Sequence, residues 1–388
     1  MDFQFSIGDE AFRKQLHEFL KERVTGEVVE EIGKWKTEGP LSKRLLRELG
    51  KKGWLLPLAP REYGGLGATY LQQYIALDEI AYFTKTWAFT STVATGPFFM
   101  IFGNEEQKRK YLSQLARGEI EISEGYTEPE AGSDLTAIKT RAVEHDDHWI
   151  INGHKIYTTA GCHADYQVLC ARTEETIPRH RGLSLFIVPM DSPGVTIRPM
   201  WTLADYKVGE EFYDNVRIPK ENLLGEKNKG FQQLMSALDL ARFFPFPVGY
   251  LRQAIEELVK YTKDRETNGK PLARDPLVRQ KIAELAIEVE TAYNLAYRTA
   301  WMLDQGKNIR LEASVVKVFI SELIQRLDCA GLSIMGPHGQ LGLGSTHAPF
   351  NGLLGQQFLL SSYATISGGT SEIQRNVIAQ RGLELPRS

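Results

Sequence analysis

The spacing of apolar residues changes twice along this 388-residue chain, and that change limits the folds open to it. From residue 8 to about 118, apolar residues recur three and four positions apart, which predicts helices. From about 119 to 226, short alternating segments such as EFYDNVRIP predict strands. Long helical patterns such as LRQAIEELVKYTKDR return from about 227. We therefore expect three domains, at residues 1–118, 119–226 and 227–388.

The expected fold is mostly α with a central β domain. Short strands separated by turn residues predict a small barrel-like or sandwich-like middle domain between an N-terminal helical domain and a C-terminal helical domain. Within HWIINGHKIYTTAG, the pair Asn152-Gly153 predicts a two-residue hairpin turn. The C-terminal helices are longer than is typical, which favours a four-helix bundle.

Composition excludes several classes of function. The chain is 42% hydrophobic and 24% charged, which is ordinary for a globular protein, and its net charge of −3 argues against a nucleic-acid partner. No apolar run approaches the ~20 residues that span a bilayer, and the first residues lack the pattern of a signal peptide. We expect a cytoplasmic protein with neither a membrane partner nor a nucleic-acid partner.

Several common site motifs are missing. The glycines of GPHGQLGLG follow a long helix instead of a strand, so they do not predict a Rossmann cofactor site. HExxH, CxxC and GxSxG do not occur, and no metal site is expected. The three cysteines, Cys162, Cys170 and Cys329, are widely spaced and are interpreted as small buried side chains.

The stretch EGYTEPEAGSDLTAIKT, residues 124–140, brings hydroxyls and backbone N–H groups together in a turn-rich loop. Thr127, Gly132 and Ser133 belong to it. Such a loop can donate hydrogen bonds to a ring carbonyl or a phosphate. It can equally be a plain surface turn, and the residues of this loop alone leave both interpretations open.

With three further motifs the whole chain resembles the acyl-CoA dehydrogenase family. YTEPEAGSD, INGHKIYTTAG, RETNGK and GGTSEIQR match the signatures of that family in order. The resemblance implies FAD bound between the β domain and the C-terminal bundle, an acyl-CoA substrate and an electron-transfer flavoprotein as partner. It also implies a homotetramer in which the adenine half of FAD meets a neighbouring subunit, or a heterotetramer with a related subunit.

The resemblance also assigns roles to residues of this chain. Tyr126, Thr127 and Ser133 would border the flavin ring and the thioester, with Gly132 in the same loop. Tyr157 would lie against the ring and Thr159 at its N5. Arg265 and Thr267 would reach a neighbour's pyrophosphate, with Ser333 and Gly336 nearby, and Thr370 and Glu372 would lie on the pyrophosphate side.

The catalytic carboxylate of the family is absent from both of its known positions. Gly368 occupies one, facing the thioester, and Ala241 occupies the other, beside a retained Arg242. A general base contributes ~10²- to 10⁴-fold to the rate. Asp239 is the nearest carboxylate in sequence, and it is either the base or a contact of the pantetheine arm. The two prolines of FFPFP are expected to bend this helix near the thioester.

Four functions stay open on these grounds. The leading hypothesis is an α,β-dehydrogenation of an unusual acyl-CoA, with electrons passed to an electron-transfer flavoprotein. The others are a base-less subunit of a heteromeric acyl-CoA dehydrogenase, an elimination of the desulfinase type, and a silent acyl-CoA-binding protein. Five phenylalanines either line an acyl pocket or fill the core: Phe89, Phe98, Phe99, Phe243 and Phe244.

Overall fold

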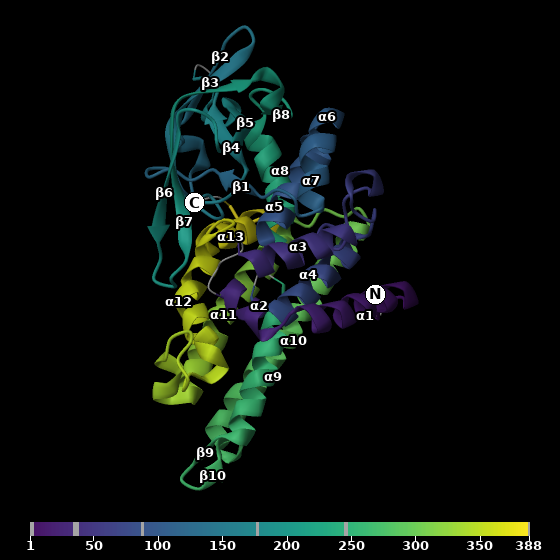
Figure 1. Ribbon diagram of the computed structural model, residues 1–388, viewed down its shortest axis with the longest axis vertical. Coiled ribbons are helices and arrows are strands. Elements are labelled where there is room, and N and C mark those ends of the chain that lie inside the picture. The colour runs from purple at the N-terminus through teal and green to yellow at the C-terminus, as the bar shows by residue number, and fades with distance from the viewer. Residues whose placement is uncertain (1–3, 34–38, 87–88, 176–177, 244–246, 387–388) are drawn as a thin grey trace.

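The computed structural model describes residues 4–33, 39–86, 89–175, 178–243 and 247–386. Within helix α8, the side chains of Asp239, Ala241, Arg242 and Phe243 also lie outside the described set, as does that of Thr90. Helices form both ends of the chain and strands form its middle, as the sequence predicts (Figure 1). Within the described ranges, no helix has both the length and the apolar character needed to cross a bilayer.

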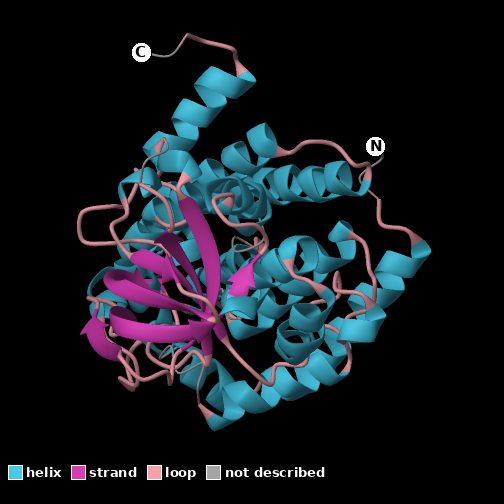
Figure 2. Cartoon of the chain, turned by 90° about the horizontal axis from the view of Figure 1, so that it is seen from above, coloured by secondary structure: helices cyan, strands magenta, loops and turns pink. Residues whose placement is uncertain are grey.

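The N-terminal helices pack into a cluster that lies beside the strands and the C-terminal helices (Figures 1 and 2). Their bounds are α1 Ile7–Arg23, α2 Gly26–Gly33, α3 Pro40–Lys51, α4 Tyr70–Thr84, α5 Thr90–Phe102, α6 Glu105–Gln107 and α7 Ser113–Ala116, with a π-helical turn at Lys108–Leu112. Thr69 caps α4 by accepting a hydrogen bond from the Gln72 N–H, the local signal that fixes where this helix begins.

The middle of the chain forms one eight-stranded sheet in the order β6-β7-β3-β2-β4-β5-β8, with β1 added beside β4. The strands are β1 Ile122–Gly125, β2 Arg141–Glu144, β3 His148–Thr158, β4 Tyr166–Arg172, β5 Leu183–Pro189, β6 Val195–Trp201, β7 Lys207–Pro219 and β8 Leu223–Leu224. Trp149 of β3 meets Phe186 of β5 with ring centroids 5.0 Å apart. The sheet therefore folds over on itself like a barrel and encloses its own apolar core.

The predicted hairpin turn at Asn152-Gly153 is wrong, because both residues lie inside the continuous strand β3. The turn comes earlier, where the His145 N–H bonds the His148 carbonyl. Asn152 instead accepts a hydrogen bond from the Asn215 N–H at 2.9 Å, next to a β-bulge. A Cβ at Gly153 would lie 2.2 Å from the Thr140 hydroxyl, so the glycine permits a close approach of two strands.

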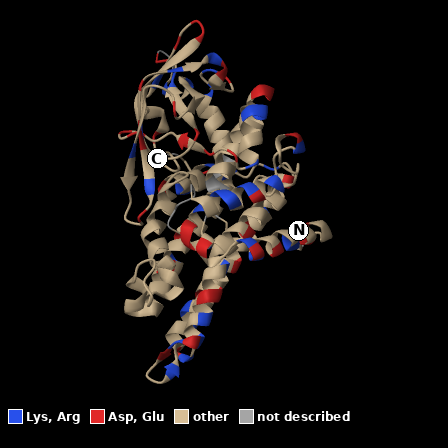
Figure 3. Ribbon diagram, in the orientation of Figure 1, with Lys and Arg blue, Asp and Glu red and all other residues tan. Residues whose placement is uncertain are grey.

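The C-terminal helices α8 Gly230–Phe243, α9 Gly249–Asp264, α10 Pro276–Asp304, α11 Arg310–Met335, α12 Leu353–Ile366 and α13 Ser371–Val377 form the bundle. The small hairpin of β9 Glu266–Thr267 and β10 Lys270–Pro271 joins α9 to α10. One apolar cluster unites α4 with α9 to α12, including Leu77, Leu258, Ala292, Ile320 and Leu360. Side chains of both charge signs lie along the exposed helices (Figure 3).

A further expectation needs correction, and another falls outside the described residues. Only Cys170 is buried; Cys162 is half-buried and Cys329 is exposed, because Cys329 lies on the outer side of α11. The bend predicted at FFPFP falls on residues 244–246, which lie outside the described set; α8 is described as far as Phe243, and a separate helix, α9, begins at Gly249. Proline lacks the N–H that would continue the helix. Phe89, Phe98 and Phe99 are buried in the core, whereas Phe243 and Phe244 lie outside the described side chains.

Candidate cofactor and acyl-CoA site

A buried ion pair fixes the loop that follows β1. Lys155 Nζ of β3 lies 2.7 Å from Glu128 Oε1, and both side chains are buried. The same ammonium donates to the Tyr126 carbonyl at 3.1 Å, and the Thr140 N–H donates to Glu128. Burial alone would raise the pKa of Glu128, but the neighbouring Lys155 and the backbone donors outweigh it and lower that pKa. The pair therefore holds residues 126–128 against β3.

This arrangement places two of the predicted motifs side by side. The Ile156 N–H donates to the Thr127 carbonyl at 3.0 Å, so Thr127 lies next to the end of β3. Gly132 and Ser133 are exposed farther along the loop, and the space around Gly132 is open. The loop thus presents a hydroxyl and backbone N–H groups beside Tyr157, as a cofactor-binding loop must.

Tyr157 is held in an unusual conformation. Its φ is +62°, in the left-handed region, and the side chain is 59% exposed. A bulky residue rarely adopts this φ, and such strain persists where the surroundings over-determine it. Ala160 shares the left-handed region, with φ +61°. The segment therefore directs an aromatic ring outward, where it can stack on a planar ligand.

Three hydroxyl groups meet between β3 and α12. Thr159 Oγ1 and Tyr363 Oη share a hydrogen bond of 3.0 Å. Burial, and then the neighbouring Tyr363, raise the pKa of Tyr206, while the Thr159 hydroxyl acts in the opposite direction. The threonine expected at a ring nitrogen therefore lies where the β domain contacts the C-terminal bundle, joined to tyrosines that the sequence analysis did not select.

The paired glycines after α12 have a conformational role of their own. Gly368 has φ +66° and Gly369 φ +88°, values that favour glycine. The Gly368 carbonyl accepts from Gln374 at 3.1 Å, and a Cβ on Gly369 would lie 2.4 Å from the same Gln374 amide. The turn closes before α13, which Thr370 caps by accepting from the Ile373 N–H at 3.2 Å.

The structure adds a carboxylate that sequence reasoning missed. Glu124 of β1 lies 3.3 Å from the Tyr126 hydroxyl, which donates to its Oε1. Burial raises the pKa of Glu124 to about 7, although the Tyr126 hydrogen bond opposes the rise. The charge of Glu124 in turn adds to the burial that raises the pKa of Tyr363. A carboxylate placed two residues before the YTEPEAGSD motif was the available signal in the sequence.

Asp239 and Arg242, the sequence candidates for the base and its neighbour, lie on α8 close to its C-terminal end. Their side chains fall outside the described residues. Ala241, which stands at the second known position of the base, lies on the same helix turn. The role of Asp239 stays a prediction.

The predicted pyrophosphate contacts fall into two separate groups. Arg265 Nη2 and His338 Nε2 lie 3.1 Å apart, which brings Arg265 next to the segment after α11 that contains Gly336, with Ser333 just before it and Thr267 in the exposed hairpin. Thr370 and Glu372 instead lie just before Gln374 in the chain. The Gln374 side chain accepts a hydrogen bond of 2.8 Å from the Ser314 hydroxyl, near the start of α11. Ser371 and Glu372 also border a hollow that reaches Cys329 and Ala330, one helical turn before Ser333.

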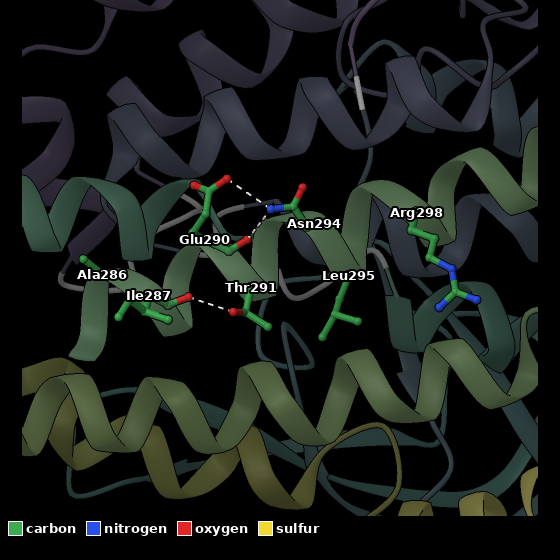
Figure 4. A pocket seen from close by; sticks show the side chains of 7 residues that line it. All are labelled: Ala286, Ile287, Glu290, Thr291, Asn294, Leu295 and Arg298. Atoms are coloured by element: carbon green, nitrogen blue, oxygen red, sulfur yellow. Dashed lines mark hydrogen bonds between the residues drawn. The ribbon is translucent and has the colours of Figure 1, made fainter. Parts of the chain in front are cut away.

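Two hollows lie on the surface of the bundle. One is lined by Thr365, Ser371 and Glu372 together with residues of α10 and α11, so the Glu372 group borders a concavity. The other follows one face of α10, where Asn294 and Thr291 bond within their own helix (Figure 4). Among the described residues, no group of three or more His, Cys, Asp and Glu side chains is suited to a metal ion.

Comparisons with known proteins agree with this geometry. Three domain models match in succession: acyl-CoA dehydrogenase N-terminal domain at residues 8–119, middle domain at 123–216 and C-terminal domain at 228–383. Acyl-CoA dehydrogenase FadE26 of Mycobacterium tuberculosis is 30% identical, with 100% of both chains covered. Subunit CarC of the caffeyl-CoA reductase–Etf complex of Acetobacterium woodii is 29% identical over 97% of this chain and 98% of CarC.

Among solved structures, the ChsE4–ChsE5 complex from Mycobacterium tuberculosis contains a chain with a TM-score of 0.91 and 28% identity, with 100% of both chains covered. These matches define the class as flavoprotein oxidoreductases acting on acyl-CoA. The chain belongs to the acyl-CoA dehydrogenase family, whose members depend on FAD. The outward-facing ring of Tyr157, the hydroxyl of Thr159 and the open loop at Gly132 fit such a cofactor.

Proposed function

We propose that this chain binds FAD and oxidises the acyl group of a coenzyme A thioester between its α and β carbons. The observation that carries the proposal is Tyr157, an aromatic side chain held 59% exposed in a strained conformation beside Thr159. A bound flavin supplies the acceptor for a hydride. Tyr157 would stack on its ring, Thr159 would hydrogen-bond its edge, and the loop with Thr127 and Ser133 would supply donors to the ring and the thioester.

The division of the pyrophosphate contacts supports an oligomer. Arg265 and Thr267 are exposed, at the end of α9 and in the hairpin that follows it, whereas Thr370 and Glu372 lie at the start of α13. We infer that Arg265 and Thr267 of one subunit complete the cofactor site of a neighbour. A monomer by light scattering that still retains flavin would contradict this arrangement.

A second candidate is one subunit of a heteromer whose partner supplies the catalytic carboxylate. Two observations favour it: neither Ala241 nor Gly368 is a carboxylate, and a similar solved chain comes from a complex of two unlike subunits, ChsE4 and ChsE5. The similarity to CarC, a subunit of a complex with an Etf, supports an electron-transfer flavoprotein as the electron acceptor.

The absorption spectrum of the purified protein tests the proposal. A yellow protein that bleaches anaerobically when acyl-CoA is added supports redox catalysis. A yellow protein that does not bleach with any of a panel of saturated acyl-CoAs contradicts dehydrogenation by this chain alone. A colourless protein, whose colour does not develop on adding FAD, contradicts the cofactor assignment.

A further inference from the structure

The side chain of Glu124 points toward the α-helical domains. Successive residues of a strand point to opposite faces. Ser123 accepts a hydrogen bond from Gln167 at 3.2 Å, and a Cβ on Gly125 would meet the same Gln167, so these two residues face the sheet interior. Ile122, Glu124 and Tyr126 therefore face the other way, where Ile122 joins Phe98 of α5 in an apolar cluster.

This face of β1 is part of the candidate site. The Tyr126 ring lies 6.4 Å from the ring of Phe98, and its hydroxyl bonds Glu124. On the side of α12, Glu124 acts electrostatically on Tyr363, which shares a hydrogen bond with Thr159. Glu124 thus acts on Tyr363, whose hydroxyl bonds Thr159, the residue proposed for the flavin edge.

The charge of Glu124 is not balanced by a cation among the described residues. The titratable groups that act with it are Tyr126, just after the end of β1, and Tyr363 on α12, while Cys170 of β4 acts on Tyr126. The described side chains of α5 contribute hydroxyls and apolar groups at this point. In such surroundings the neutral form of a carboxyl group is favoured, because burying the ionised form costs free energy.

A second carboxylate near the site is already engaged. Glu121 accepts a hydrogen bond from the Ser91 hydroxyl at 3.0 Å, and its other oxygen lies 3.1 Å from His163 Nε2. Both oxygens of Glu121 are therefore occupied by side-chain partners.

We propose that Glu124 is the base that removes the α-proton of the acyl-CoA, in place of the Glu missing at Ala241 and Gly368. This inference rests on the proposed function. The α C–H bond breaks and its proton passes to a Glu124 oxygen. The electron pair left at the α carbon would form the α,β double bond, and the β-hydride would go to the flavin that the site would hold. Glu124 then returns its proton to solvent.

The titration of Glu124 suits this role. Its pKa of about 7 lies near neutral pH, the range in which a general base acts most effectively. Tyr126 can hold one carboxylate oxygen while the other accepts the proton, because a carboxylate has two oxygens with separate lone pairs.

The central experiment replaces Glu124 by Gln, which keeps the shape and removes the base. With acyl-CoA in excess, flavin reduction in Glu124→Gln is expected to slow by ~10²- to 10⁴-fold. Flavin content and the spectral change on binding a non-oxidisable thioester analogue are expected to stay as in the parent protein. The matched controls Glu121→Gln and Glu211→Gln change a neighbouring and a strand-interior carboxylate and are expected to reduce flavin within a few-fold of the parent rate.

Exchange of the substrate's α-protons with D₂O separates this inference from the proposed function, because exchange needs a base but no oxidation. Exchange by the parent protein that is lost in Glu124→Gln supports Glu124 even if the flavin never bleaches. Exchange or reduction at the parent rate in Glu124→Gln overturns the inference, and a simultaneous loss in Asp239→Asn would assign the proton to Asp239. Glu124→Asp, which keeps a carboxyl group, should retain partial exchange and guards against misfolding of the Gln variant.

Discussion

Two carboxylates of the same short segment, Glu124 and Glu128, lie in opposite electrostatic settings. Glu128 faces the sheet interior, where Lys155 and backbone N–H groups compensate its charge and lower its pKa. Glu124 faces α5 and α12, where one tyrosine hydroxyl is its hydrogen-bond donor and burial raises its pKa to about 7. This segment therefore contains a structural acid, Glu128, which must stay ionised, close to an acid, Glu124, that can gain and lose a proton.

The largest effect is expected when the buried ion pair between Lys155 and Glu128 is broken. Lys155→Met leaves Glu128 buried without its cation, and removing one partner of a buried pair costs ~3–5 kcal/mol. Denaturant unfolding should show this loss in the free energy of unfolding. The double variant Lys155→Met/Glu128→Gln should recover most of it, since the unpaired charge is gone. A double variant as unstable as the single one would mean that Lys155 acts through packing alone.

The next effect concerns pH and a third acid, Glu211. It is fully buried, and burial raises its pKa from 4.5 to about 7, although the Thr158 hydroxyl and Lys155 oppose the rise. The folded state therefore holds a proton that the unfolded state has lost between pH 4.5 and about 7. Stability contributed by this proton is complete below the lower value and is lost as the pH rises through the higher one.

Glu211→Gln should remove the loss of stability that accompanies the rise in pH. Relative to the parent protein, the variant is expected to gain on the order of 3 kcal/mol in the free energy of unfolding between pH 5 and pH 8. Unfolding curves at several pH values measure it. Glu124→Gln should shift the same profile in the same direction, while Glu128→Gln should not. Parallel profiles for parent and Glu211→Gln would contradict the raised pKa.

A third prediction tests whether FAD bound by one copy of the chain is also held by Arg265 of a second copy. Arg265→Ala removes an exposed guanidinium that we propose reaches a neighbour's pyrophosphate, and hydrogen bonds to charged groups contribute ~1.5–3 kcal/mol. FAD should bind roughly 10- to 100-fold more weakly, measured by fluorescence titration of the apoprotein. Arg274→Ala, a change at a nearby exposed arginine, serves as control. Unchanged FAD affinity in Arg265→Ala would place this residue outside the cofactor site.

The smallest effect is expected at Gly368. Its φ of +66° makes any side chain there strained, so Gly368→Ala should cost ~1 kcal/mol in the free energy of unfolding. Gly368→Glu should cost a similar amount while adding a carboxylate where the family usually has one. If Glu124 is the base, Gly368→Glu should raise flavin reduction little. A large gain in Gly368→Glu would show that the parent chain lacks a base.

Much of the fold was predictable from sequence because its signals are local. The change from helical to alternating spacing predicted the order of helices and strands, and the four motifs indicated the family. The prediction of a hairpin turn at Asn152-Gly153 was wrong because the same pair also fits a β-bulge beside Asn215. Only the pairing of β3 with β7 decides between a turn and a bulge.

The sequence by itself determined the order of the domains and the absence of a carboxylate at residues 241 and 368. Only the tertiary structure decided that the charge of Glu124 acts on Tyr363 and that Arg265 lies beside His338. Apolar spacing and motifs depend on neighbours along the chain. The solvation and charge around a carboxylate depend instead on side chains brought from distant segments, here β1, α5 and α12, by the packing of the domains.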